Sequence, residues 1–268
     1  MKKAKTIYRV ARTRQELEEA FSLVYKEYLT RGYIPKDYRS RLRISLYNAL
    51  PSTTTFVAKQ GKNVVAAVTL IPDSSLGLPM DKIYKKELDV LRKQNCKIAE
   101  VSQLAIDTSP FVKHSFSMFN FGKLIFIFRL FKALLDYALD IEHLTNLCIA
   151  INPKQQLLYK FLYFEPIGGL KYYASVNKAP AVALNLRLNE AEQKARSRMS
   201  LYKIFFGNKT DPKSLEGKFK LSPRDLECLF VEKSNIFEKL TPAQINILKA
   251  SYPLQQIDRI LSKVINNF

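Results

Sequence analysis

The stretch KIAEVSQLAID, Lys97–Asp107, decides the fold of this chain. Apolar and polar residues alternate along most of its length, which is the period-two pattern of a half-buried β-strand. It carries one carboxylate near its start, Glu100, among side chains that favour the interior. A nearly continuous apolar segment follows from Phe119 to Leu139 and is long enough for a helix packed across a sheet. A strand with one acid inside it, then a loop, then a buried helix is typical of an α/β active site, where loops at strand ends carry the chemistry.

The segments around this strand predict an alternation of strands and helices. Thr13 can cap a helix with Glu16 three residues later, which is the capping-box pattern, and Gly32 is its expected end. In chain order we expect strands at 8–10, 53–59, 64–71, 97–107, 144–151, 169–176 and 181–188, and helices at 13–32, 38–50, 81–95, 119–139 and 153–163. This order indicates a mixed central sheet with helices on both faces, an α/β or layered α+β class.

The composition of the sequence changes after Leu188. Residues 189–200 are charged and helix-prone, and 207–217 form a polar linker. Ser222-Pro223 and Thr241-Pro242 each pair an N-cap residue with proline at the first helical position, so we expect helices near 223–233, 242–251 and 254–264. The chain therefore divides into a main domain, residues 1–188, and a helical C-terminal extension, residues 189–268, which is a candidate lid or docking element.

Composition narrows the class of protein. With 268 residues and 47% hydrophobic content, the chain can bury a substantial core. Three widely separated cysteines lack the CxxC spacing of zinc or redox sites, which fits a reducing compartment, and no His/Cys/Asp cluster predicts a metal. No secretory signal and no apolar run of membrane-spanning length is present. We expect a cytoplasmic protein, and peripheral contact with a membrane is compatible with the sequence.

The net charge is +19, from 43 basic and 24 acidic side chains. A field of this strength implies an anionic partner, such as nucleic acid, anionic lipid or an acidic protein. Residues 189–268 hold only 14 of the basic and 9 of the acidic groups, so the excess belongs mainly to residues 1–188. No RNA-binding signature or recognition-helix pattern is present, which disfavours nucleic acid.

Several short pieces resemble a known superfamily. The segment NPKQQLLYKFLYF, Asn152–Phe164, resembles the motif of GCN5-related N-acetyltransferases (GNAT), although Tyr163 stands where they usually have glycine. A closer resemblance is to the N-acyl amino acid synthases, which are related to acyl-homoserine lactone synthases. It rests on Val24-Tyr25-(Lys-Glu)-Tyr28 with Gly32-Tyr33-Ile34, on Ala99–Ile106, and on Val176–Val182. The resemblance covers residues 6–188 and implies a GNAT-like sheet with the helical appendage added.

The same resemblance implies an acyl thioester as donor and no bound cofactor. Acetyl-CoA users in the superfamily grip the pyrophosphate with a glycine-rich turn before the long helix. Residues 107–123 contain one glycine, Gly122, and no such pattern. An acyl group delivered on acyl carrier protein would not need that turn, and the acidity of carrier proteins matches the basic charge of this chain. The resemblance therefore implies acyl carrier protein or acyl-CoA as the donor and a small-molecule amine as the acceptor.

Two residues are candidates for proton transfer. Making an amide from a thioester requires a neutral amine, and Glu100 is the candidate base, acting directly or through a water. The alternative is a carboxylate that pairs with a nearby Lys or Arg at a strand end. Tyr159 matches the tyrosine that protonates the thiolate in the superfamily. The alternative for Tyr159 is a core tyrosine with its hydroxyl at the rim.

Other residues are candidates for substrate binding. Backbone N–H groups of Ser102, Gln103 and Leu104 could bond the thioester carbonyl where the sheet opens, by analogy with the family. Asn152 caps the following helix or bonds the pantetheine arm, and capping is the simpler role.

Arginines near the first helix are candidates for binding anions. Arg31, beside Tyr33, matches the branch signature and is a candidate for the substrate carboxylate, with a solvated helix-end arginine as the alternative. Arg39, Arg41 and Arg43 form a candidate carrier-docking patch, because 39 and 43 share a face of the expected helix 38–50, with a merely solvated basic face as the default alternative.

The leading hypothesis is an N-acyltransferase that moves a fatty acyl group to the amine of an amino acid or a similar amine. One alternative is an acyl-homoserine-lactone-type signal synthase. Another, of a different class, is a non-catalytic basic module that binds nucleic acid or an anionic membrane.

Overall fold

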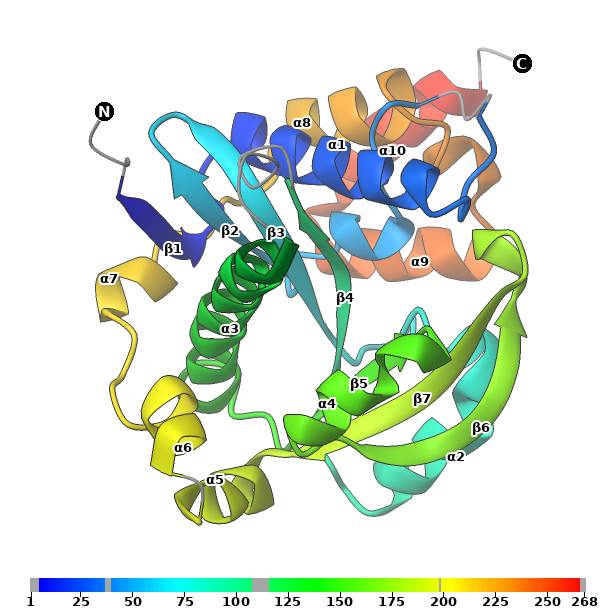
Figure 1. Cartoon of the computed structure of the whole chain (residues 1–268). Coiled ribbons are helices and arrows are strands. Elements are labelled where there is room, and N and C mark those ends of the chain that lie inside the picture. Colours follow the sequence, from blue (N-terminus) through cyan, green and yellow to red (C-terminus); the bar gives the residue numbers. More distant parts are fainter. Residues whose placement is uncertain (1–4, 37–39, 108–115, 198, 266–268) are drawn as a thin grey trace.

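A computed structural model describes residues 5–36, 40–107, 116–197 and 199–265. Its centre is a seven-stranded sheet in the order β1-β2-β3-β4-β5-β7-β6, in which only β4 and β5 pair in parallel (Figure 1). The strands are β1 (Thr6–Val10), β2 (Thr54–Gln60), β3 (Asn63–Pro72), β4 (Ile98–Ile106), β5 (Asn146–Ile151), β6 (Glu165–Tyr173) and β7 (Ala179–Arg187). The predicted mixed sheet is confirmed.

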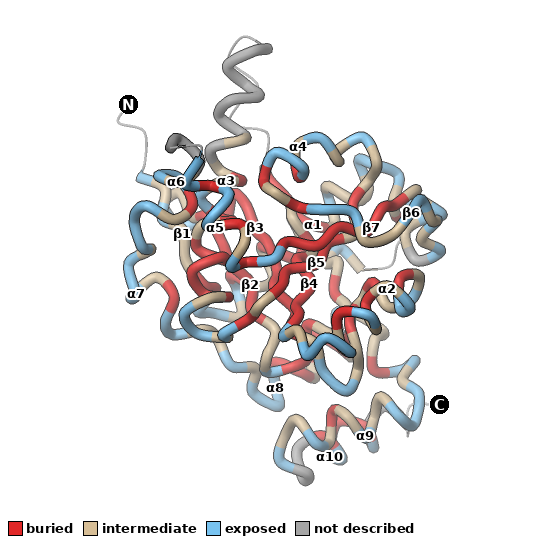
Figure 2. The backbone as a smooth tube through the Cα atoms, turned by 90° about the horizontal axis from the view of Figure 1, so that it is seen from below, coloured by how far each residue is buried: buried red, intermediate tan, exposed pale blue. Residues whose placement is uncertain are grey.

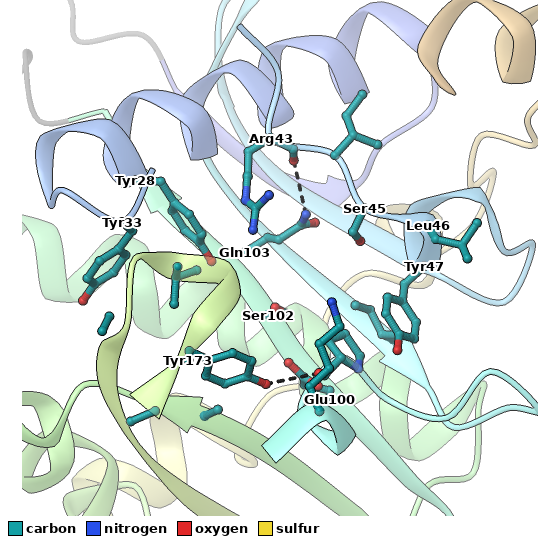
Figure 3. Close-up of a pocket in the computed structure, with 18 of the residues that line it drawn as sticks. Tyr28, Tyr33, Arg43, Ser45, Leu46, Tyr47, Glu100, Ser102, Gln103 and Tyr173 are labelled. Carbon is teal, nitrogen blue, oxygen red and sulfur yellow. Dashed lines mark hydrogen bonds between the residues drawn. The ribbon is translucent and has the colours of Figure 1, made fainter. Parts of the chain in front are cut away.

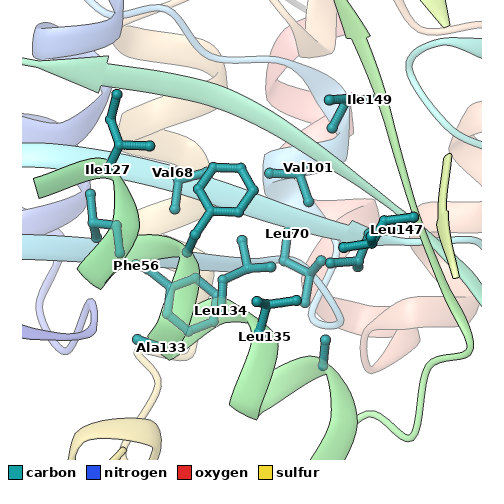
Figure 4. Close-up of a cluster of buried hydrophobic side chains, with 14 of the residues drawn as sticks. Phe56, Val68, Leu70, Val101, Ile127, Ala133, Leu134, Leu135, Leu147 and Ile149 are labelled. Carbon is teal, nitrogen blue, oxygen red and sulfur yellow. The ribbon is translucent and has the colours of Figure 1, made fainter. Parts of the chain in front are cut away.

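Helices cover both faces of the sheet. Within residues 5–187 they are α1 (Arg14–Thr30), α2 (Asp81–Lys93), α3 (Phe116–Asp140) and α4 (Gln156–Phe161), with short 3-10 turns at Leu46–Ala49 (η1), Pro153–Gln155 (η3) and Ala174–Val176 (η4). One face packs on α3, whose Leu134 and Leu135 lie with Phe56, Val68 and Leu70 of β2 and β3 in the largest apolar core of the described residues (Figure 4). The other face packs on α1 and α2. None of the described helices is both long and apolar enough to cross a membrane.

The central strand β4 is buried on both faces, so the expected half-buried strand is wrong in that respect (Figure 2). Ala99 and Val101 face the α3 core, whereas Ile98 faces the α2 core. Helices on both sides leave no face to water, and a doubly covered strand is usually apolar throughout. The acid Glu100 is therefore an exception within a dry environment.

The N-terminus of α1 is fixed by the predicted cap, with one difference. The Thr13 hydroxyl accepts from the Glu16 N–H at 3.2 Å, but the Glu16 carboxylate accepts from the Arg12 N–H at 2.8 Å instead of reaching back to Thr13. The same carboxylate pairs with Arg9 and Lys59, both at 2.6 Å. Burial by itself would raise the pKa of Glu16, yet these hydrogen bonds lower it to about 2. The Glu16 carboxylate thus links α1 to β1 through Arg9 and to β2 through Lys59.

The helix expected at 38–50 is wrong. Residues 40–45 have no helical structure, and only Leu46–Ala49 form a 3-10 turn, η1. The Arg43 N–H donates to the Phe21 carbonyl at 3.0 Å, and the Ser45 N–H donates to Asn48 Oδ1 at 2.8 Å. The first bond ties the segment to α1 in place of a bond within a helix, and the second caps the short turn η1.

The C-terminal extension packs onto the main domain. It contains α5 (Leu188–Arg196), α6 (Met199–Phe205), α7 (Pro212–Leu215), α8 (Pro223–Glu227), a π turn (Cys228–Glu232), a 3-10 turn (Phe237–Lys239), α9 (Pro242–Ser251) and α10 (Leu254–Ile265). Ser222 and Thr241 cap α8 and α9 as predicted. Buried side chains of α8, α9 and α10 share one core with Phe21 of α1 and with Ile44 and Leu46. Figure 1 shows these helices beside α1.

Candidate active site

Glu100 lies on the floor of a cavity of about 380 Å³ that opens on the face covered by α1 and α2 (Figure 3). Only 4% of this residue is exposed. Its Oε2 accepts a hydrogen bond of 2.7 Å from the Met80 N–H, and a hydrogen bond links it to the Ser102 side chain. Burial is the main cause that raises the pKa of Glu100 to about 8, opposed by these two bonds. The carboxyl group is positioned by the fold without a cationic partner in a salt bridge among the described side chains.

Besides β3, the loop before α2, β4 and the end of β5, five other parts of the chain line this first cavity. They are the end of α1 and its turn, residues 43–47, the start of α2, the β6–β7 turn and the extension. The aromatic rings of Tyr28, Tyr47 and Tyr173 point into it (Figure 3). The cavity also has apolar walls and can hold a small organic molecule.

A second cavity of about 150 Å³ adjoins the first one where the sheet opens. Strands β4 and β5 pair only from Ile98–Asn146 to Glu100–Cys148, and then they separate. Ser102, Gln103 and Asn152 line both cavities, so the two meet across the gap. The predicted opening of the sheet is therefore present directly after Glu100.

Gln103 bends β4 at this gap. Its φ of 55° is left-handed, and the pairing with β3 shifts there, between Ala67 and Thr69. Such a bulge re-aims the neighbouring backbone. The Gln103 amide exchanges hydrogen bonds of 2.9 and 3.2 Å with the Asn48 amide and donates to the Arg43 carbonyl at 3.3 Å. The side chain thus holds the strained strand, while Ser102, Gln103 and Leu104 all line the second cavity.

Tyr159 of α4 lines the second cavity and is 6% exposed. Its ring packs edge-on against Phe131 and Phe164, at 6.2 and 5.6 Å between centroids. Burial raises the pKa of Tyr159 to about 12, so its phenol stays protonated at neutral pH. Phe131 also borders a narrow apolar cleft of about 20 Å³ behind Tyr159.

Arg31 and Asn152 lie beside the second cavity, and both are already engaged. The Arg31 guanidinium donates to Glu27 Oε1 from Nε at 2.7 Å and from Nη2 at 2.5 Å. The Asn152 side chain accepts from the Lys154 N–H at 3.0 Å and so caps η3, the simpler of the two roles expected for it. Tyr33 lines both cavities and packs edge-on against Tyr28.

The docking patch expected from Arg39, Arg41 and Arg43 depended on a shared helix face, and the described residues 40–45 form no helix. Arg39 lies outside the described residues. Arg41 is exposed. Arg43 lines the first cavity, and its guanidinium stands over the Tyr28 ring at 5.4 Å. Arg43 is thus placed for contact with a substrate inside the cavity.

The structure brings the quoted sequence pieces together around the two cavities. The Asn177 side chain donates to the Gly32 carbonyl at 3.1 Å, which ties the β6–β7 turn to the turn after α1. Val176, Ala179 and Ala181 line the first cavity opposite Tyr28. Sequence reasoning missed Tyr47, Lys82, Tyr173 and Lys239 as lining residues, because no local pattern marks them. No cluster of described His, Cys, Asp or Glu side chains is able to hold a metal ion.

Comparison with known proteins agrees with this geometry. The family model "N-acyl amino acid synthase FeeM" matches residues 19–187. The solved structure of FeeM, an N-acyl amino acid synthase from uncultured soil microbes, is 32% identical and covers 73% of this chain and 100% of its own, with a TM-score of 0.61. The chain belongs to the FeeM family of N-acyl amino acid synthases. It is therefore an N-acyltransferase, as the leading hypothesis expected, and not a non-catalytic binding module.

A second solved structure shares the fold of this FeeM-family chain. The acyl-homoserine lactone synthase LasI is 18% identical, covers 78% of this chain and 98% of its own, and has a TM-score of 0.54, which shows a common fold. A search of curated protein sequences found no match. The GNAT-like sheet predicted from the sequence is thereby confirmed for this FeeM-family chain.

Proposed function

We propose that this enzyme transfers a fatty acyl group from acyl carrier protein to the α-amine of an amino acid, with Glu100 as the general base. The observation that carries the proposal is the place of Glu100, on the floor of one cavity and directly before the gap that leads to a second cavity. The acceptor amine occupies the first cavity, and the thioester enters through the second. The two reactants then meet at Ser102 and Gln103.

The reaction balances with the groups that line the two cavities. The amine nitrogen attacks the thioester carbonyl carbon, the C–S bond breaks and the N–C bond of the amide forms. Glu100 takes the proton that the nitrogen loses. Backbone N–H groups between Ser102 and Leu104 are placed to donate to the carbonyl oxygen as it gains charge. The sulfur leaves as a thiolate and takes a proton from solvent, and the proton on Glu100 is then returned to solvent.

The acidity of Glu100 suits this role. Its pKa of about 8 lies close to that of an amino-acid α-amine, so the proton moves between groups of similar basicity. A base works best when its pKa is near the working pH, because enough of it is ionised and its basicity is still high. An exposed glutamate would be ionised but too weak a base.

Tyr159 contributes a hydrogen bond to the departing sulfur. The pKa of Tyr159 is near 12 and that of an ordinary thiol is about 8.5, so full proton transfer to a thiolate would be unfavourable by a factor of about 10³ to 10⁴. A phenol that stays protonated can nevertheless stabilise the developing negative charge at sulfur by donating to it. We therefore assign Tyr159 a donor role and leave the final proton to solvent.

The surface beside the second cavity favours acyl carrier protein over CoA as the acyl donor. Beside the second cavity, α4 and its preceding turn present two exposed lysines, Lys154 and Lys160, around two exposed apolar side chains, Leu157 and Phe161. Leu157 is 81% exposed, which is unusual for a leucine and fits the contact face of a partner. An acidic carrier would meet complementary charge there and from the net +19 of the chain.

The test is acylation by the purified enzyme. Acyl carrier protein and CoA carrying the same fatty acyl group are offered with a panel of amino acids, and N-acyl products are measured by mass spectrometry. We expect an amide product, a higher kcat/KM for the carrier-bound donor, and a fall of that value with rising salt. Equal or better use of acyl-CoA would overturn the carrier as donor. No amide with either donor would overturn the proposed reaction.

A further inference from the structure

The C-terminal extension contributes one wall of the first cavity. Four of its side chains line the space above Glu100, namely Ile236, Lys239, Leu240 and Gln244. The family model ends at residue 187, and the whole FeeM chain is covered by 73% of this one. This wall is therefore built by residues that lie beyond the matched family core.

The wall is held firmly against the main domain. Phe237 is 2% exposed and stacks on Phe230 at 5.2 Å between centroids. Both belong to the core that includes Phe21 and Ile44. Thr241 and Gln244 exchange capping hydrogen bonds at the start of α9. Residues 236–244 thus have a fixed position relative to the cavity and are not a loose tail.

The charges around the cavity favour an anionic group on the bound molecule. Among the described residues that line it, three are cationic, Arg43, Lys82 and Lys239, and one is acidic, Glu100. An amino acid that presents its amine to Glu100 carries its carboxylate on the adjacent carbon. That carboxylate then lies within the same cavity, where the exposed ammonium groups of Lys82 and Lys239 can reach it and form a charge-assisted hydrogen bond.

We propose that the extension completes the acceptor site of this enzyme and that Lys239 binds the carboxylate of the acceptor amino acid. The inference rests on the proposed function, because it identifies the acceptor as an α-amino acid. The apolar neighbours Ile236 and Leu240 then face the acceptor side chain. Selectivity for the acceptor would lie partly in an element beyond the family core, whereas the acyl-transfer chemistry stays on β4.

The test compares Lys239→Ala with a matched control, using L-phenylalanine and L-phenylalaninamide as acceptors. Lys220 is an exposed lysine of the same extension that lines neither cavity, so Lys220→Ala removes the same charge elsewhere. We expect Lys239→Ala to raise KM for phenylalanine about three- to tenfold with kcat little changed. Lys239→Arg should retain most of the affinity, and Lys220→Ala should match the wild type.

The amide separates carboxylate recognition from a general effect on the cavity. Wild-type enzyme should prefer phenylalanine to its amide, and Lys239→Ala should lose most of that preference. If the wild type forms product and Lys239→Ala keeps both KM and the preference, the inference is wrong and the proposed function stands. If the wild type forms no product, the proposed function fails. Calorimetry of phenylalanine binding then decides the inference, and equal affinity of wild type and Lys239→Ala would overturn it.

Discussion

At the scale of the residue, Glu100 links catalysis to pH. Its pKa of about 8 means that the carboxyl group ionises between about pH 7 and 9. We expect wild-type kcat/KM, calculated per concentration of free amine, to rise through that range and to level off above it. Glu100→Gln should be about 10²- to 10³-fold slower and should lack this rise. Steady-state kinetics from pH 6 to 9.5 measures both, and an unchanged pH profile in Glu100→Gln would contradict the base role.

The same carboxyl group weakens the fold as it ionises. Its pKa is raised from an ordinary 4.5 to about 8, so the folded protein binds the proton more tightly than the unfolded chain does. The stability that this group contributes is full below about pH 4.5 and is lost as pH rises to about 8. Glu100→Gln escapes this loss, so at pH 9 its Tm should equal or exceed that of the wild type.

A lower Tm at pH 9 would instead mean that the fold stabilises the ionised carboxylate. The melting curves at pH 5 provide the control, because Glu100 is protonated there and resembles glutamine in shape and charge.

At the scale of the element, Gly168 allows α2 to pack on β6. A methyl group at Gly168 would lie 2.7 Å from the buried Tyr84 ring and 3.3 Å from Ala183. The Tyr84 hydroxyl donates to the carbonyls of Gly169 and Ala181, at 2.9 and 2.7 Å, so the ring cannot shift freely. We expect Gly168→Ala to lower the free energy of unfolding by about 1–3 kcal/mol, measured by urea denaturation.

The neighbouring glycine supplies the control. A methyl group at Gly169 meets nothing within 4 Å, and its φ is not left-handed. Gly169→Ala should therefore leave stability nearly unchanged. Equal losses in the two variants would show that backbone freedom, and not the Tyr84 contact, is what glycine provides in this strand.

At the scale of the whole molecule, the shared core predicts that the sheet and the extension unfold together. Phe230 is fully buried between the extension and α1, so Phe230→Ala should cost about 3–5 kcal/mol. We expect one calorimetric transition in both wild type and variant, moved to lower temperature in the variant. Phe161→Ala, at a residue 44% exposed, should barely move it. A separate early transition in Phe230→Ala would mean that the extension is an independent domain.

The sequence allowed much of this architecture to be predicted where the signal is local. The strand at Lys97–Asp107 and the caps at Ser222 and Thr241 depend on neighbouring residues, and all three are present in the structure, although the strand is buried on both faces and not half-buried. The helix expected at 38–50 failed because the Arg43 N–H bonds to the distant Phe21 carbonyl and Ser45 caps only the short 3-10 turn η1. Lys239 could not be predicted to share a cavity with Glu100, because only the tertiary core brings the two segments together.

The extension is synthesised after the sheet, so the core that the two share is incomplete for a time. A ribosome makes about 5–20 residues per second, so the strands through β7 are complete roughly 2–8 s before residues 226–230 are made. During that interval Phe21, Ile44 and Leu46 lack the helices that later cover them. The nascent chain then exposes an apolar surface. We expect a chaperone that binds such surfaces to recognise it during this interval.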